Sequence, residues 1–191
     1  MKIRSSLLFL LLLSTGYMSG CAVGVGAGAA TGAAIAYDRR TTGTMVDDEL
    51  IEFKVIDAVR EDKELWNQIH LNATSYNNIV LLTGESPTEE LRDRTGSLAR
   101  QVPKVRKVHN EMSIAAPSSM LSRSSDTWIT GKVKTNLLTD DTEAIHIKVV
   151  TESGSVYLMG LVTHAEADAA TEITRKVSGV QRVVRVFEYT D

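Results

Sequence analysis

The chain has 191 residues, of which 43 % are hydrophobic, so it can bury a core and is not a wholly disordered protein. Its formal net charge of -3 argues against a general nucleic-acid binder, because such proteins gain affinity by neutralising phosphates. The single cysteine excludes an intramolecular disulfide and a metal site rich in thiolates. No apolar run reaches the roughly 18 residues that a membrane-spanning helix needs.

The first 20 residues have the layout of a secretory signal. Lys2 and Arg4 supply the positive charge, and Leu7 to Leu13 form a short apolar segment. The segment Met18-Ser19-Gly20-Cys21 then resembles the bacterial lipobox, in which the cysteine is acylated and becomes the mature N-terminus. We therefore predict a lipoprotein signal at residues 1–20 and a lipid (palmitate-type) anchor on Cys21. An ordinary signal peptide followed by a free cysteine is the alternative.

Residue 22 is alanine and not aspartate, which by resemblance to enterobacterial sorting predicts the outer membrane, with the protein facing the periplasm. An uncharged run rich in glycine and alanine continues to Ala36. Its glycines at every fourth position could let helices approach closely, but its composition favours a flexible tether. We assign residues 21–45 to the lipidated cysteine and this tether.

The rest of the chain carries one pattern twice, as residues 46–115 and 125–191, with a linker at residues 116–124. Val80-Leu81-Leu82-Thr83-Gly84 aligns with Val156-Tyr157-Leu158-Met159-Gly160. The apolar stripe of the first copy aligns with that of the second at three positions: Ile51, Val55 and Val59 with Ile129, Val133 and Leu137. Because the alignment needs few gaps, we interpret the copies as a duplication.

Each copy is predicted to fold as helix, strand, strand, helix, strand. The first helices are expected to begin at the N-caps Asp48 and Asp126, and tight turns are expected at Asn77-Asn78 and at Ser153-Gly154. Ser86 is the expected N-cap of the second helix of copy one, and Thr163 with Glu166 forms a capping box in copy two. The fold class is therefore α+β: two αββαβ domains, each with a three-stranded mixed sheet and two helices on one face.

The αββαβ order, the strands that end at Gly84 and Gly160, and Ser178-Gly179-Val180 resemble the BON (bacterial OsmY and nodulation) domain. The resemblance covers residues 46–191, although Pro103 and Lys104 stand in copy one where the motif has a glycine before the valine. It implies a protein that binds phospholipid and maintains envelope integrity. The family is not known for catalysis.

The chain offers little that predicts an enzyme. None of the four histidines has a second ligand at metal-binding spacing on one helix face, and we interpret His70, His109 and His146 as half-exposed strand residues. There is no nucleophile elbow or phosphate loop. We therefore expect no catalytic residue, no metal site and no cofactor.

The two first helices differ in charge. Residues 47–62 carry seven carboxylates and two basic residues, whereas residues 126–138 carry one carboxylate and two lysines. Tryptophan favours the membrane interface and lysines are attracted to anionic lipid, so copy two is predicted to bind an anionic phospholipid membrane. The predicted contacts are Trp128, Lys132, Lys134 and Leu161, the last replacing the charged Glu85 of copy one at a strand exit taken to be exposed.

Two alternatives stay open. Trp128 could instead fill the gap between the copies. The protein could also be a structural adaptor whose domains bind envelope or division-site proteins.

Overall fold

The structure is a computed structural model that describes residues 38–116, 120–139 and 146–191. Residues 38–191 form one compact unit. The predicted signal, Cys21 and most of the predicted tether lie outside the described residues. No helix in the described ranges is both long enough and apolar enough to cross a membrane.

The first repeat has two long helices and a mixed sheet. Its elements are α3 (Thr42–Glu61), the short α4 (Lys63–Trp66), β1 (His70–Tyr76), β2 (Ile79–Ser86), α5 (Glu89–Gln101), β3 (Lys107–Asn110) and β4 (Ser113–Ile114). β2 is the central strand: it pairs antiparallel with β1 and parallel with β3 and β4. The closing strand is therefore interrupted, which gives this sheet a fourth strand that the sequence pattern does not predict.

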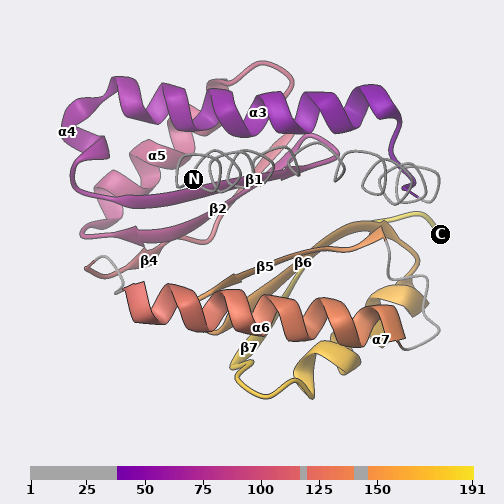
Figure 1. The fold of residues 1–191 in the computed structure, drawn as a ribbon. Helices are drawn as coiled ribbons and strands as arrows, with labels where there is room; N and C mark the ends of the chain where they lie inside the picture. The colour runs from indigo at the N-terminus through magenta and orange to yellow at the C-terminus, as the bar shows by residue number, and fades with distance from the viewer. Residues whose placement is uncertain (1–37, 117–119, 140–145) are drawn as a thin grey trace, which may run out of the picture. The chain divides into compact units, whose positions relative to one another are not determined.

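The second repeat has the same order without the interruption. Its elements are α6 (Met120–Thr139), β5 (Lys148–Glu152), β6 (Ser155–Val162), α7 (His164–Arg175) and β7 (Arg182–Tyr189). β6 lies between antiparallel β5 and parallel β7. In each repeat both long helices cover one face of the sheet (Figure 1). The predicted α+β fold with two mixed sheets is confirmed.

The first helix of each repeat begins earlier in the sequence than predicted. α3 begins at Thr42 with Thr41 as its N-cap, and α6 begins at Met120. Asp48 and Asp126 are therefore not N-caps. Both lie inside their helices and are buried, 2 % and 6 % exposed respectively.

These two buried carboxylates instead hold the hairpin turns. Asp48 accepts hydrogen bonds from the backbone N–H groups of Asn77 and Asn78, at 2.8 and 2.7 Å. Asp126 accepts from the corresponding groups of Ser153 and Gly154, both at 2.9 Å. Each carboxylate satisfies turn donors that would otherwise be buried without an acceptor, so it ties the first helix to the hairpin.

Other local predictions are mostly confirmed. The turn residues Asn77 and Asn78 have φ of 51° and 62°, and Ser153 and Gly154 have 48° and 73°, as type I′ hairpins require. Thr163 and Glu166 form the predicted capping box. The N-cap of α5 is Thr88 and not Ser86, because β2 continues through Ser86.

The central strands are buried on both faces. In β2, Val80 and Leu82 pack under the helices of the first repeat, whereas Ile79 and Leu81 face the other way. β6 alternates in the same manner. The outward faces of the two sheets meet in a third apolar cluster of Tyr76, Ile79, Leu81, Tyr157, Met159 and Val186. This explains why both strands read as continuous apolar runs rather than alternating ones.

Candidate functional site

Three of the four predicted lipid contacts lie on α6 of the second repeat. Trp128 is 70 % exposed, so its ring does not fill a gap between the repeats. At 100° per residue, Trp128, Gly131, Thr135 and Leu138 lie within about 80° of one another on the helix surface, and Leu138 is 64 % exposed. The one carboxylate of α6, Asp126, is buried against the hairpin turn. Residues 123–139 of α6 therefore expose apolar, basic and uncharged polar side chains, but no carboxylate.

The two predicted lysines flank this surface on different sides. Lys132 is partly buried, and its ammonium group donates a hydrogen bond to the carbonyl oxygen of Ser178. This contact holds α6 against the loop that follows α7. Lys134 is exposed. Lys134 lies one helical turn before Leu138, whereas Lys132 has a structural contact with the loop after α7.

Leu161 does not lie with these residues. It belongs to β6, is partly buried, and packs against the apolar cluster between the sheets. The turn at Gly154, which contacts α6 through Asp126, is seven residues away along the hairpin, about 20 Å at the rise of a β-strand. The expectation of an exposed strand exit at Leu161 is wrong.

Ion pairs with other parts of the chain offset some of the negative charge that the sequence of α3 carries. Basic side chains from other elements pair with three of its carboxylates: Lys104 with Asp47, Arg40 with Asp48 and Lys148 with Glu52, at 2.7, 2.8 and 2.8 Å. α3 also exposes an apolar stripe of its own, in which Val46, Leu50 and Phe53 are 54 %, 46 % and 68 % exposed.

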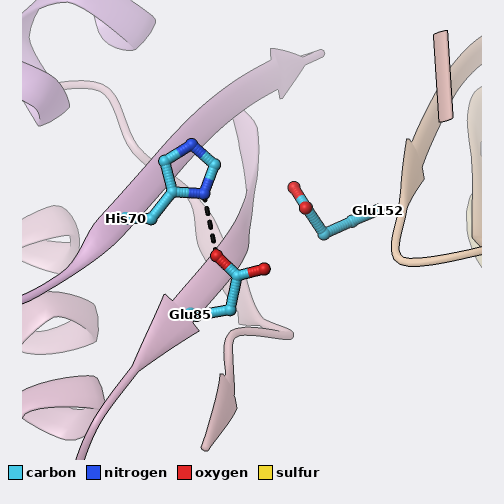
Figure 2. A group of neighbouring side chains, drawn as sticks. All are labelled: His70, Glu85 and Glu152. Atoms are coloured by element: carbon cyan, nitrogen blue, oxygen red, sulfur yellow. Dashed lines mark hydrogen bonds and ion pairs between the residues drawn. The ribbon is translucent and has the colours of Figure 1, made fainter. Parts of the chain in front are cut away.

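A cluster of titratable side chains joins the two repeats. His70 opens β1, Glu85 lies opposite it near the end of β2, and Glu152 ends β5. One ligand atom from each side chain lies within 4.8 Å of the other two. His70 Nδ1 is 2.9 Å from Glu85 Oε2, and Glu152 extends toward this pair from the second repeat (Figure 2).

The cluster combines burial with negative charge. Glu85 is 2 % exposed and Glu152 is 9 % exposed. Burial raises the pKa of Glu152, a hydrogen bond from the Asn72 amide opposes the rise, and the nearby Glu85 carboxylate adds to it. The charged Glu85, which the sequence suggested to be an exposed residue, therefore faces the contact between the repeats.

Gly84 allows this arrangement. It has φ of 114°, and a Cβ atom at this position would lie 2.1 Å from the carbonyl oxygen of His70. A larger residue would force the two strands apart where His70 faces Glu85.

The BON domain family model matches residues 47–116 and 125–191. The chain belongs to the BON-domain family. It therefore has two BON domains, the first containing α3 to β4 and the second α6 to β7.

Three relatives of this BON-domain protein have informative names. It is 41 % identical to the outer membrane lipoprotein DolP of Haemophilus influenzae over 185 residues, which cover 96 % of each chain. It is 37 % identical to a 21 kDa hemolysin of Actinobacillus pleuropneumoniae, over 80 % of this chain and 79 % of that protein. It is 29 % identical to the osmotically inducible protein Y of Escherichia coli, over 74 % and 72 % respectively. The first similarity supports an outer membrane lipoprotein with a role in the cell envelope.

The cluster of His70, Glu85 and Glu152 was missed by sequence reasoning. A search for ligands on one helix face cannot find residues at the ends of three strands. The hairpin register would have placed His70 opposite Glu85, because residues 70–76 pair with residues 79–85 around a two-residue turn. No sequence signal places Glu152 beside them, since that contact depends on how the two domains pack.

Proposed function

We propose that this chain is a non-enzymatic lipoprotein, anchored through Cys21 in the outer membrane and facing the periplasm, that binds anionic phospholipid through α6 of its second BON domain. Binding of this kind would support envelope integrity. The observation that carries the proposal is the surface of α6, where Trp128 and Leu138 are exposed, Lys134 lies one turn before Leu138, and residues 123–139 of the helix have no exposed carboxylate.

Two contributions to the binding free energy favour an anionic membrane at this surface. Apolar side chains that enter the headgroup region leave water, and a tryptophan ring is favoured at that depth because it is both apolar and able to donate a hydrogen bond. Each lysine near an anionic surface adds about 1 kcal/mol at most, and salt weakens this term. Trp128, Lys132 and Lys134 are the proposed contacts, and Leu161 remains a separate prediction because it lies elsewhere on the domain.

NMR titration of residues 38–191 tests the proposal. This unit contains all three apolar clusters of the described chain, so its cores are kept. Micelles with a phosphoglycerol headgroup should shift the amide signals of residues 124–138 and of the Trp128 indole, whereas zwitterionic micelles should shift them much less. If the largest shifts fall on α3, or if both micelles act alike, the proposed surface is wrong.

A second candidate function rests on the exposed stripe of Val46, Leu50 and Phe53 on α3. These side chains lie within about 60° of one another on the helix, and acidic residues surround them. Such a surface suits a protein partner with an apolar centre and basic rim better than an anionic membrane, so it favours an adaptor that binds envelope or division-site proteins.

The two functions can be separated in cells that lack the protein. A Phe53→Glu variant should restore envelope integrity if lipid binding alone is needed, and a Trp128→Glu variant should not. The reverse result would favour the adaptor function. Resistance to detergent is a suitable measurement, with immunoblotting to check that both variants reach the wild-type level.

A further inference from the structure

We propose that His70, Glu85 and Glu152 bind a divalent transition-metal ion of the Zn²⁺ type, held between the two BON domains. One potential ligand atom from each residue lies within 4.8 Å of the others. His70 and Glu85 come from the first domain and Glu152 from the second (Figure 2). The three proposed ligands include none of the proposed lipid contacts Trp128, Lys132 and Lys134.

The donor set selects the class of metal. One imidazole nitrogen and two carboxylate oxygens suit Zn²⁺ and similar ions, whereas Ca²⁺ and Mg²⁺ prefer oxygen ligands alone. Ligands about 2.1 Å from a tetrahedral ion lie about 3.4 Å apart. The separation of 2.9 Å between His70 Nδ1 and Glu85 Oε2 is close to this value, so a modest side-chain adjustment lets both coordinate one ion. Glu152 can then complete a three-ligand set by rotation of its side chain.

The unpaired oxygen of Glu85 is an independent sign that a ligand belongs here. Glu85 is 2 % exposed, and its Oε1 atom is buried without a hydrogen-bond partner among the described residues. A buried carboxylate oxygen without a donor or cation is costly and uncommon. The second oxygen of the same group already contacts His70, so the side chain cannot turn Oε1 toward solvent without losing that contact. A cation at this position satisfies Oε1 and reduces the repulsion between Glu85 and Glu152.

The surroundings supply a supporting contact and a route for the ion. The Asn72 amide donates to Glu152 Oε2 at 3.0 Å, which orients this carboxylate as outer-shell groups do in metal sites. A pocket of about 350 Å³ is lined in part by His70, Asn72 and Glu152 and lies open to solvent. Water or an incoming ion can therefore reach His70 and Glu152 from this pocket, and a water molecule can occupy the fourth position.

The internal duplication provides a natural comparison. In the alignment of the repeats, His70 corresponds to His146, Glu85 to Leu161 and Glu152 to Tyr76. The corresponding positions thus keep the histidine but have lost both carboxylates. His146 is buried, and its Nδ1 atom has no hydrogen-bond partner within the described chain. The second place therefore lacks the two carboxylates that the proposed site uses, which makes His146 a matched control for His70.

Because the ligands come from both domains, the ion would fix one BON domain against the other. Isothermal titration calorimetry of the acylated protein in detergent micelles with ZnCl₂ tests this. We expect one tight site per chain, with Zn²⁺ binding at least tenfold tighter than Ca²⁺ or Mg²⁺. The Glu152→Gln variant should weaken Zn²⁺ binding at least tenfold, since even outer-shell substitutions cost about 10–100-fold at metal sites.

Variants of both domains distinguish the proposed site from other places on the protein where Zn²⁺ could bind. His70→Ala and Glu152→Gln should each weaken Zn²⁺ binding at least tenfold, and His146→Ala should leave the affinity unchanged. His164→Ala tests the exposed His164–Asp191 pair, which is a competing place for adventitious Zn²⁺. Circular dichroism without metal checks the fold of each variant, and Glu152→Gln is the decisive one because Gln keeps the shape of Glu.

Zn²⁺ should also raise the melting temperature of the wild-type protein but not that of Glu152→Gln. The proposal is overturned if wild-type protein binds Zn²⁺ no more tightly than His70→Ala does, or if His164→Ala removes the site. It is equally overturned if Glu152→Gln folds normally and keeps full affinity, because the ion then does not join the two domains.

Discussion

Replacing Trp128 by glutamate should weaken binding to anionic vesicles by at least tenfold. The ring is 70 % exposed, and a tryptophan side chain offers up to about 250 Å² of surface. About 175 Å² is thus free, and insertion of half of it removes about 90 Å² from water. At about 25 cal/mol per Å² this contributes about 2 kcal/mol, or a factor of about 30 in affinity. The new carboxylate adds repulsion from the lipid phosphates.

The assay is co-sedimentation of residues 38–191 with vesicles of phosphatidylglycerol and phosphatidylcholine. Without the acyl anchor, the measured affinity reports the protein surface alone. Leu50→Glu is the matched control, because Leu50 occupies the aligned position on α3 and is 46 % exposed. It should leave binding unchanged. Trp128→Phe should retain most of it, and salt should weaken wild-type binding.

The fold of Trp128→Glu should be intact, because Ile129, Val133 and Leu137 still fill the core beneath α6. Its melting temperature should therefore stay within a few degrees of the wild-type value. Undiminished vesicle binding by a folded Trp128→Glu protein would refute the reasoning. An equal loss in Leu50→Glu would show that binding is not confined to the second domain.

Three further outcomes are expected. Cys21→Ala should prevent incorporation of labelled palmitate and release the protein from the outer-membrane fraction; a labelled variant would contradict the lipobox assignment. The hydrogen bond from Arg39 lowers the pKa of Glu166 from its ordinary value of 4.5 to about 2. The pair therefore stabilises the folded state fully above about pH 4.5, and this contribution to the free energy of unfolding is lost as the pH falls toward 2. Glu166→Gln should therefore lose less stability than the wild type over that interval in acid-unfolding curves. Asp126→Ala leaves two turn N–H groups without their acceptor and should cost about 2–4 kcal/mol in urea unfolding, whereas a loss below about 1 kcal/mol would mean that water replaces the carboxylate.

Much of each BON domain is determined locally, and the sequence shows it. The stripe of Ile129, Val133 and Leu137 forms a helix because one face must be buried, and the Asn77-Asn78 turn adopts positive φ because asparagine tolerates it. Because the pattern occurs twice, the sequence predicts two domains of the same fold. The α6 surface could also be selected from sequence, because residues 126–138 carry two lysines and one carboxylate where the aligned helix is strongly acidic, but the exposure of Trp128 came from the structure.

Contacts between distant segments could be identified only from the tertiary structure. Asp48 and Asp126 have the residue type of an N-cap, yet each is buried inside a helix because a hairpin turn packs on it. Leu161 and Glu85 lie near the ends of equivalent strands that were expected to be exposed there, but the outward faces of the two sheets pack together, which buries Glu85 and partly buries Leu161. Glu152 approaches His70 and Glu85 only because the domains meet there, and neither strand alternation nor helical periodicity encodes which residues two sheets bring face to face.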